Sequence, residues 1–182
     1  MKNSQSAENN GGGQSAAREA VEQRLVRLLR ENHGMLGRLA GSYAASPSDR
    51  ADLVQEIAFA LWRALPNFRG ECSERTFLYR IAHNRCMAHL AARRSAEPLT
   101  EDALELPDPA PHPEVSVSQD QETDRLVSAI RKLPVGYRQV IVLTLEGLDY
   151  GEIAQVVGIG KSNVGVRLNR ARLMLKKLLG ET

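Results

Sequence analysis

Residues 150–178, YGEIAQVVGIGKSNVGVRLNRARLMLKKL, contain two apolar stripes at helical spacing with a short break between them. Asp149 precedes Glu152 by three residues, which is the spacing of a capping box and predicts a helix that begins at Tyr150. Gly158 can adopt the left-handed conformation with which helices end tightly. The stretch therefore predicts two helices joined by a sharp turn.

The second helix is basic and contains no acidic residue. Gly160 or Ser162 would cap it, and small Ala154 would let it cross the first helix closely. Its apolar repeat consists of Val164, Leu168, Ala171 and Leu175. This arrangement indicates a helix-turn-helix, and the basic outer face favours a DNA reader over the alternative, a helical hairpin that binds nothing.

The side chains of the second helix that avoid its apolar stripe are the candidate DNA contacts. Asn and Arg can read adenine and guanine edges in the major groove, and Lys and Ser can bind phosphates. The set consists of Lys161, Ser162, Asn163, Val166, Arg167, Asn169 and Arg170. Arg172, Lys176 and Lys177 lie further along, where a solvated helix end favoured by the helix dipole explains them equally well.

The composition favours an all-helical protein with no membrane segment. The chain has 182 residues, 42% of them hydrophobic and only 4% aromatic, and Ala, Leu, Arg and Glu dominate. Two cysteines, Cys72 and Cys86, do not form a disulfide framework, which fits a reducing cytoplasm. The first 20 residues lack the apolar core of a secretory signal, and no apolar run is long enough to span a bilayer.

Charge is strongly zoned along the chain. Residues 21–96 contain twelve arginines and seven acidic residues, and residues 125–182 contain ten basic and four acidic residues. Between them, residues 97–124 contain nine acidic residues and no basic one. Two basic blocks joined by an acidic segment indicate an anionic partner such as nucleic acid.

The same segments suggest the domain organisation. Residues 1–18 are polar and glycine-rich and predict a disordered tail, and residues 19–96 form a first helical domain. Residues 97–118 contain five prolines and predict a linker, and residues 119–182 form a second helical domain that contains the helix-turn-helix. The fold class is therefore all-α, with two small domains joined by an acidic, proline-rich linker.

Helix signals divide each domain further. In SPSDRADLVQEIAFALWRAL, Ser48 or Asp49 would cap a helix that ends at Pro66. A polar loop follows, and residues 75–94 then read as one long helix. In the second domain, a helix from about residue 136 to 146 would stop at Gly147.

Two motif blocks in this order resemble a known family. The run from LPVGYRQVIVLTLEGLDYGEIAQVVGIGKSN to the C-terminal leucines resembles the fourth domain of bacterial sigma factors, most closely the small extracytoplasmic-function (ECF) group of the sigma-70 family. DLVQEIAFALWRALPNFRG and RTFLYRIAHNRCMAHLAARR resemble that group's second domain. Together the matches cover about residues 22–96 and 120–179.

The resemblance implies a sigma factor that binds core RNA polymerase, directs it to promoters and opens them. The helix with DLVQEI would dock on the polymerase, because an acidic pair beside exposed apolar groups gives a specific contact. The residues implied are Asp52, Leu53, Gln55, Glu56 and Phe59. The alternative is that Asp52 and Glu56 only favour the first turns of a helix.

The resemblance also implies that the first domain holds the unpaired strand of the −10 element, because aromatic rings stack on unpaired bases and arginines bind phosphates. The residues implied are Phe68, Arg69, Arg75, Thr76, Phe77, Tyr79, Arg80, His83 and Asn84. The family often has Trp where Phe77 stands. For Phe77 and Tyr79 core packing is the alternative, and we expect one of them in the core.

The second domain would read the −35 element with its basic helix. This helix departs from the family's pattern at Gly160, where Ser is common, and at Gly165, where a larger residue is usual. Glycine within a helix costs about 1 kcal/mol relative to alanine, so a close approach of the backbone to DNA is one reason to keep it. The acidic linker either mimics nucleic acid in a polymerase channel or only keeps the chain soluble and extended.

Other chemistries find little support. His83, Cys86 and His89 lie on one helix, but they lack the ligand pairs of structural zinc sites, so we expect no metal and no cofactor. No phosphate loop or nucleophile–base pair is present, so we expect no enzyme.

The rival functions are a dimeric helix-turn-helix repressor or activator and a pure protein-interaction module. Many relatives bind an anti-sigma factor, but no residue here identifies one.

Overall fold

The computed structural model describes residues 9–96 and 119–180, and these are helices joined by short turns, without a strand among them. This confirms the all-α prediction. The predicted linker, residues 97–118, lies outside the described residues. In order, the elements are α1 (Asn9–Gly41), α2 (Pro47–Ala64), the 3-10 turn η1 (Leu65–Asn67), α3 (Glu74–Ala96), α4 (Gln119–Arg131), α5 (Val135–Leu145), α6 (Tyr150–Val157) and α7 (Lys161–Leu179).

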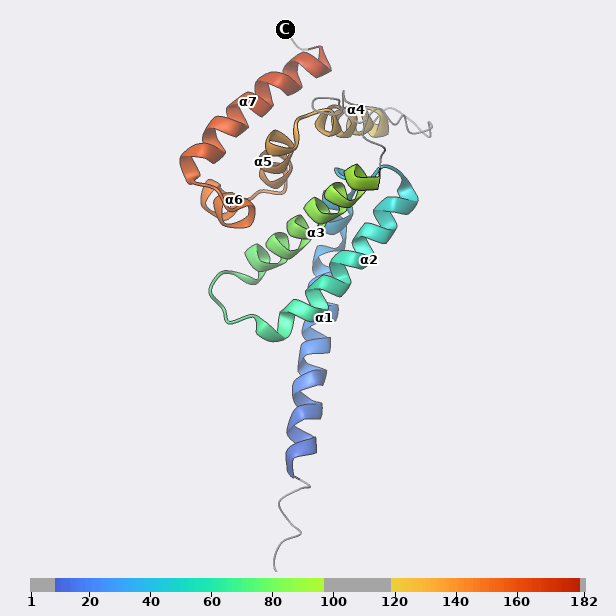
Figure 1. The fold of residues 1–182 in the computed structure, drawn as a ribbon, viewed down its shortest axis with the longest axis vertical. Coiled ribbons are helices and arrows are strands. Elements are labelled where there is room, and N and C mark those ends of the chain that lie inside the picture. The colour runs from blue at the N-terminus through green and yellow to red at the C-terminus, as the bar shows by residue number, and fades with distance from the viewer. Residues whose placement is uncertain (1–8, 97–118, 181–182) are drawn as a thin grey trace, which may run out of the picture.

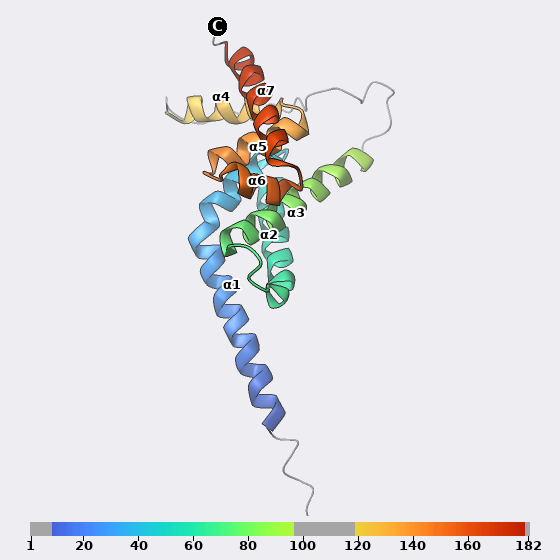
Figure 2. The same cartoon turned by 90° about the vertical axis from the view of Figure 1, so that its left-hand side faces the viewer.

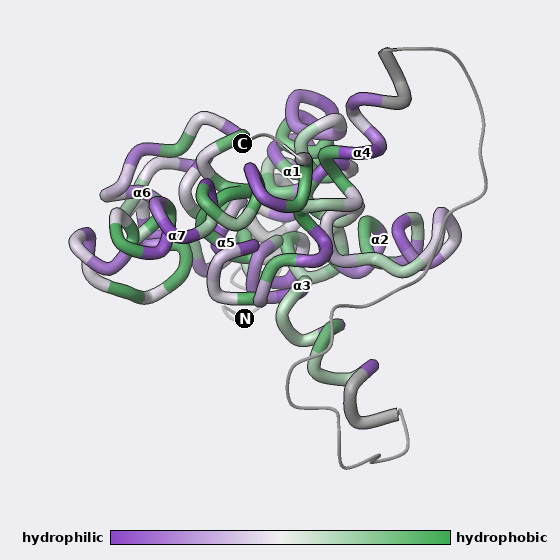
Figure 3. The backbone as a smooth tube through the Cα atoms, turned by 90° about the horizontal axis from the view of Figure 1, so that it is seen from above, coloured by the Kyte–Doolittle hydropathy of each residue, from purple (hydrophilic) through white to green (hydrophobic). Residues whose placement is uncertain are grey.

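The first three helices pack as a bundle in which α2 lies against both α1 and α3 (Figure 1). The buried stripe of α2 consists of Leu53, Ile57 and Leu61, each 0% exposed. These side chains pack with Leu36 and Leu39 of α1 and Leu78 of α3 in the buried core. Along each helix hydrophobic and hydrophilic residues alternate, as expected of helices that bury one face (Figure 3).

Helix α1 begins at Asn9, so the prediction of a disordered tail up to residue 18 is wrong for residues 9–18. Residues 1–8 lie outside the described residues. The N-terminal half of α1 projects from the bundle, away from the C-terminal end of the chain (Figures 1 and 2). Once Leu28 and the residues after it are packed, each further residue adds a hydrogen bond without a new nucleation cost, and the helix extends over polar sequence.

The N-terminal cap of α2 also differs from the prediction. The cap is Ser46, whose hydroxyl oxygen accepts a hydrogen bond from the Asp49 amide at 3.1 Å. Asp49 reaches back and accepts from the Ala45 amide at 2.6 Å, and Pro47 occupies the first turn. The sequence contains several Ser and Asp residues that could cap this helix. Proline favours the first helical position, so Pro47 makes the preceding residue, Ser46, the cap.

The second half confirms the predicted helix-turn-helix. Asp149 and Glu152 form a reciprocal capping box, and Gly158 ends α6 with a φ of 75°. The Ile159 amide donates to the Ala154 carbonyl at 3.2 Å, which closes the turn. Gly160 is the N-cap of α7 and makes no side-chain bond. The predicted apolar repeat is buried: Val164, Leu168, Ala171 and Leu175.

The two halves contact each other at the C-terminal end of α1. The Arg131 guanidinium donates to the Gly41 carbonyl at 2.6 and 2.9 Å. Arg138, only 7% exposed, reaches the Ser42 carbonyl at 3.5 Å and lies 5.9 Å from the centre of the Tyr43 ring. Arginines from the second half thus satisfy carbonyls at a helix end that its own backbone leaves unpaired.

A second contact joins α1 and α3 to the turn after α5. Arg38 donates twice to the Glu146 carboxylate, at 2.7 Å each, and Arg75 donates to the Glu146 backbone carbonyl at 2.6 Å. The Glu146 side chain is 7% exposed, whereas that of Arg38 is 63% exposed. The hydrogen bond to Glu146 raises the pKa of Arg38. This turn therefore ties the helix-turn-helix to the first bundle.

Glu146→Gln keeps the shape of this contact and removes its charge. Because Arg38 is mostly exposed, we expect a loss of only about 0.5–1 kcal/mol in the closure of the two halves. The change should appear as a larger radius of gyration in small-angle X-ray scattering and a greater sensitivity to salt. Glu22→Gln, at an exposed position of α1, is the control. An unchanged radius across salt concentrations would show that the carboxylate does not hold the halves together.

Candidate DNA-binding and protein-binding surfaces

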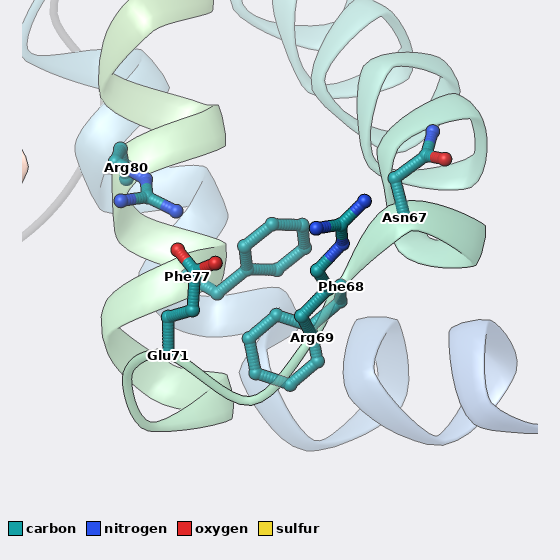
Figure 4. A pocket seen from close by; sticks show the side chains of 6 residues that line it. All are labelled: Asn67, Phe68, Arg69, Glu71, Phe77 and Arg80. Atoms are coloured by element: carbon teal, nitrogen blue, oxygen red, sulfur yellow. The ribbon is translucent and has the colours of Figure 1, made fainter.

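The loop between η1 and α3 forms a small cavity with the first turns of α3 (Figure 4). The rings of Phe68 and Phe77 lie side by side, with centroids 4.6 Å apart. Phe77 and Arg80 project from α3. The other lining residues come from the end of η1 and from the loop that follows it (Figure 4). The cavity measures about 150 Å³ and is lined by Asn67, Phe68, Arg69, Glu71, Phe77 and Arg80. Aromatic faces with arginines at the rim suit an unpaired base and its phosphate.

The predicted −10 contacts divide into an exposed and a buried group. Arg69, Arg75 and Asn84 are exposed, and Phe68 and Arg80 are half-buried. Four residues are buried: Thr76 (3% exposed), Phe77 (7%), Tyr79 (3%) and His83 (3%). Thr76, Tyr79 and His83 recur at three- and four-residue steps, so they share the face of α3 that turns inward. The nine residues therefore do not share one exposed surface, and their contact with the −10 element stays a prediction.

Local contacts explain why two of these residues are buried. Ser73 accepts a hydrogen bond from the Thr76 amide at 3.0 Å, and the two hydroxyls are 2.8 Å apart, so Thr76 belongs to the helix cap. The Arg75 guanidinium lies 5.7 Å from the centre of the Tyr79 ring, beside Glu146 of the second half. Burial raises the pKa of Tyr79. Both Phe77 and Tyr79 are thus buried, although only Phe77 borders the cavity.

His83 is a buried imidazole, and neither ring nitrogen has a hydrogen-bond partner within the described residues. Burial lowers its pKa from the ordinary value of 6.5. The nearby Cys86 thiol is 0% exposed, and burial raises its pKa to about 12. These groups are therefore neutral near neutral pH and belong to the core.

The buried His83 should make stability depend on pH. Its folded pKa lies below the unfolded value of 6.5, so the unfolded state binds the proton more readily. Stability contributed by the neutral ring is present above pH 6.5 and declines as pH falls from 6.5 toward the folded pKa. Denaturant titrations of wild type and His83→Gln between pH 5 and 8 measure this. We expect a flatter profile for the variant, and parallel profiles would exclude His83 as the source.

The outer face of α2 presents a mixed polar and aromatic surface. Asp52, Gln55 and Glu56 are exposed, and Phe59 is 55% exposed. Leu53, by contrast, is 0% exposed, so its prediction as a surface contact is corrected to a core position. It falls on the stripe with Ile57, which the 3.6-residue period turns inward.

Sequence reasoning missed two members of this surface. Trp62 is 47% exposed, and its ring centroid lies 5.7 Å from that of Phe59. The Arg63 guanidinium lies 5.9 Å from the Phe59 ring. Trp62 and Arg63 follow Phe59 by three and four residues. This spacing places side chains next to one another on a helix surface, so it could have been recognised in the sequence. An exposed aromatic pair beside a cation is typical of the centre of a protein interface.

All seven predicted −35 contacts lie on the outer side of α7. Lys161, Ser162, Asn163, Val166, Asn169 and Arg170 are exposed, and Arg167 is half-buried. Arg167 donates to the Asn163 side-chain oxygen at 3.1 Å. A Cβ at Gly165 would lie 3.5 Å from the Tyr150 ring, an ordinary contact, so packing does not require glycine there.

Other kinds of site find no support in the described part of the chain. No three His, Cys, Asp or Glu side chains gather there as a metal site would need. His89 instead lies 3.0 Å from the Asp49 carboxylate. None of the helices at residues 9–96 and 119–180 has the length and apolar character to cross a membrane.

Comparison with known proteins identifies the family. The family model for Sigma-70 region 2 matches residues 28–96, and that for Sigma-70, region 4 matches residues 123–175. The chain is 34% identical to the RNA polymerase sigma factor CnrH of Cupriavidus metallidurans over 86% of this chain and 87% of CnrH. It is 33% identical to the ECF RNA polymerase sigma-E factor of Escherichia coli K12, over 74% of this chain and 75% of that protein.

Solved structures show the same fold. CnrH in complex with the cytosolic domain of CnrY matches with a TM-score of 0.67 at 28% identity, over 91% of this chain and 94% of that chain. RpoE in complex with the anti-sigma factor NepR from Bartonella quintana matches with a TM-score of 0.66 at 24% identity and supports the fold alone. The chain belongs to the sigma-70 family and to its ECF group. It is a transcription initiation factor that directs RNA polymerase to promoters.

Proposed function

We propose a division of this role among three surfaces of the chain. The outer face of α2 binds core polymerase, α7 reads the −35 element, and the cavity beside Phe68 and Phe77 receives an unpaired base of the −10 element. The cavity is the observation that carries the proposal, because neighbouring aromatic rings with arginines beside them fit an unpaired base and its phosphate. The polymerase supplies the chemistry, and the chain works in the cytoplasm.

Reconstitution tests this function against the rival operator-binding protein. The purified chain is added to core RNA polymerase and to a library of genomic fragments, and the transcripts are sequenced. We expect transcripts with defined start sites only when both proteins are present. An operator-binding dimer would instead shift duplex fragments without polymerase and would not direct initiation.

The aromatic pair on α2 gives a prediction for core binding. Phe59→Ala and Trp62→Ala each remove a large exposed ring from the proposed interface, and such anchors contribute about 2 kcal/mol or more, which is about thirtyfold in affinity. Fluorescence-anisotropy titration of a labelled chain with core polymerase measures the loss. Val26→Ala removes apolar surface from a side chain 52% exposed on α1 and is the control. Equal weakening by all three variants would refute the assignment.

The polar side of α3 gives a prediction for promoter opening. Arg80 lines the cavity and Asn84 is exposed one turn later on the same helix. The double variant Arg80→Ala with Asn84→Ala should lose promoter opening, measured by permanganate reactivity of unpaired thymines, and should retain affinity for core polymerase. Loss of opening and of core affinity in equal measure would contradict the role given to this helix.

A protein inhibitor is a further partner that we propose for this chain. The solved structure of CnrH contains the cytosolic domain of CnrY. A polypeptide of that kind, an anti-sigma factor, is the class of partner we expect to compete with core polymerase here.

A further inference from the structure

Two arginines of α1 bind the residue that begins α3. Arg24 Nε donates to Glu74 Oε1 at 2.8 Å, and Arg27 Nη2 donates to Glu74 Oε2 at 2.9 Å. Each carboxylate oxygen thus binds its own guanidinium. The hydrogen bond from Arg27, and to a smaller extent that from Arg24, lowers the pKa of Glu74. The three side chains are between 33% and 49% exposed, so this is a surface cluster that DNA and solvent can reach.

Arg24 also contacts the cavity wall. Its guanidinium lies 5.0 Å from the centre of the Phe68 ring, and Phe68 lies against Phe77. Arg80 lies 5.9 Å from the Phe77 ring. The four side chains thus form a row of contacts from α1 through the loop to α3. The two rings and Arg80 line the cavity (Figure 4).

The loop has few other restraints. Gly70 has a φ of 77° and nothing within 4 Å of the position a Cβ would take, and Arg69 and Glu71 are exposed. At its C-terminal end, Ser73 is fixed by the helix cap. Before Gly70, the Phe68 amide donates to the Leu65 carbonyl at 3.1 Å, and its ring lies between two neighbouring side chains, Phe77 on one side and Arg24 on the other.

We propose that Arg24 and Arg27 are positioning residues for the −10 element, which rests on the function proposed above. By holding Glu74 and packing against Phe68, they fix the width of the cavity and determine which unpaired base it accepts. Glu74 holds both guanidinium groups in place, so we expect them to act on base preference through the loop. Both lie in the part of α1 that precedes Leu28, where the match to Sigma-70 region 2 begins.

A promoter library separates positioning from mere stability. Holoenzyme made from core polymerase and the chain transcribes a library in which the −10 and −35 segments are randomised, and sequencing gives the base preference at each position. The variant is Arg24→Gln with Arg27→Gln. The control is Arg18→Gln with Arg30→Gln, which makes the same charge change at exposed positions of the same helix. Glu74→Gln is a second, milder variant.

In both test variants we expect the preference for the favoured base at one or two −10 positions to fall about threefold or more. A pocket that loses its geometry discriminates less between bases. Their −35 preference and core affinity should stay within about twofold of wild type. The charge-reversed chain Arg24→Glu, Arg27→Glu, Glu74→Arg should recover part of the preference, because the ion pairs form again.

Other outcomes would overturn the inference. Reduced transcript yield with unchanged −10 preference, in the double variant and in Glu74→Gln, would show that the cluster only stabilises the fold. A wild-type holoenzyme without −10 preference would overturn the proposed function together with this inference. A wild-type preference that the variants retain would overturn only the inference.

Discussion

Arginines of the second half join it to the first by donating hydrogen bonds to carbonyls at the C-terminal end of α1. Helix ends leave carbonyls without backbone partners and carry a partial negative charge. Here Arg131 donates to Gly41, and Arg138 is buried beside Tyr43 and also donates to the Leu133 carbonyl. A buried guanidinium is tolerable only with such acceptors. These bonds tie α4 and α5 to the end of α1, while α6 packs against α3 and the turn at Glu146 lies beside Arg38 and Arg75.

This closed arrangement bears directly on the surfaces that the function needs. The outer sides of α2 and α7 remain exposed. The cavity beside Phe68 belongs to the first bundle, which consists of α1, α2 and α3 (Figure 4). Arg75, in contrast, is shared, because it donates to a carbonyl of the second half. Arg75 is exposed, so the N–H groups that this bond leaves over are the ones it can offer to DNA.

The sequence predicted the candidate DNA surface of α7 well and that of α3 less well. On α7 the apolar repeat was regular, so the remaining side chains were expected to face outward, and six of the seven are exposed while Arg167 is half-buried. On α3, the family resemblance implied Thr76, Tyr79 and His83 as DNA contacts, with core packing as the alternative for Tyr79. They are buried because a helix that packs on a neighbour at both faces turns polar side chains inward as well. On α2, the period that exposes Phe59 and Trp62 also buries Leu53.

Local chemistry in the sequence determined the helices, the capping box at Asp149, the turn at Gly158 and the family, because these depend on residues close together in the chain. Tertiary structure decided which arginines form contacts within the protein and which remain exposed as candidate DNA contacts. Arg24, Arg27, Arg131 and Arg138 look like any other basic residue of a positively charged chain. Their acceptors, Glu74 and the carbonyls at the end of α1, lie far away in sequence, mostly some fifty to ninety residues, and only packing brings them within hydrogen-bond distance.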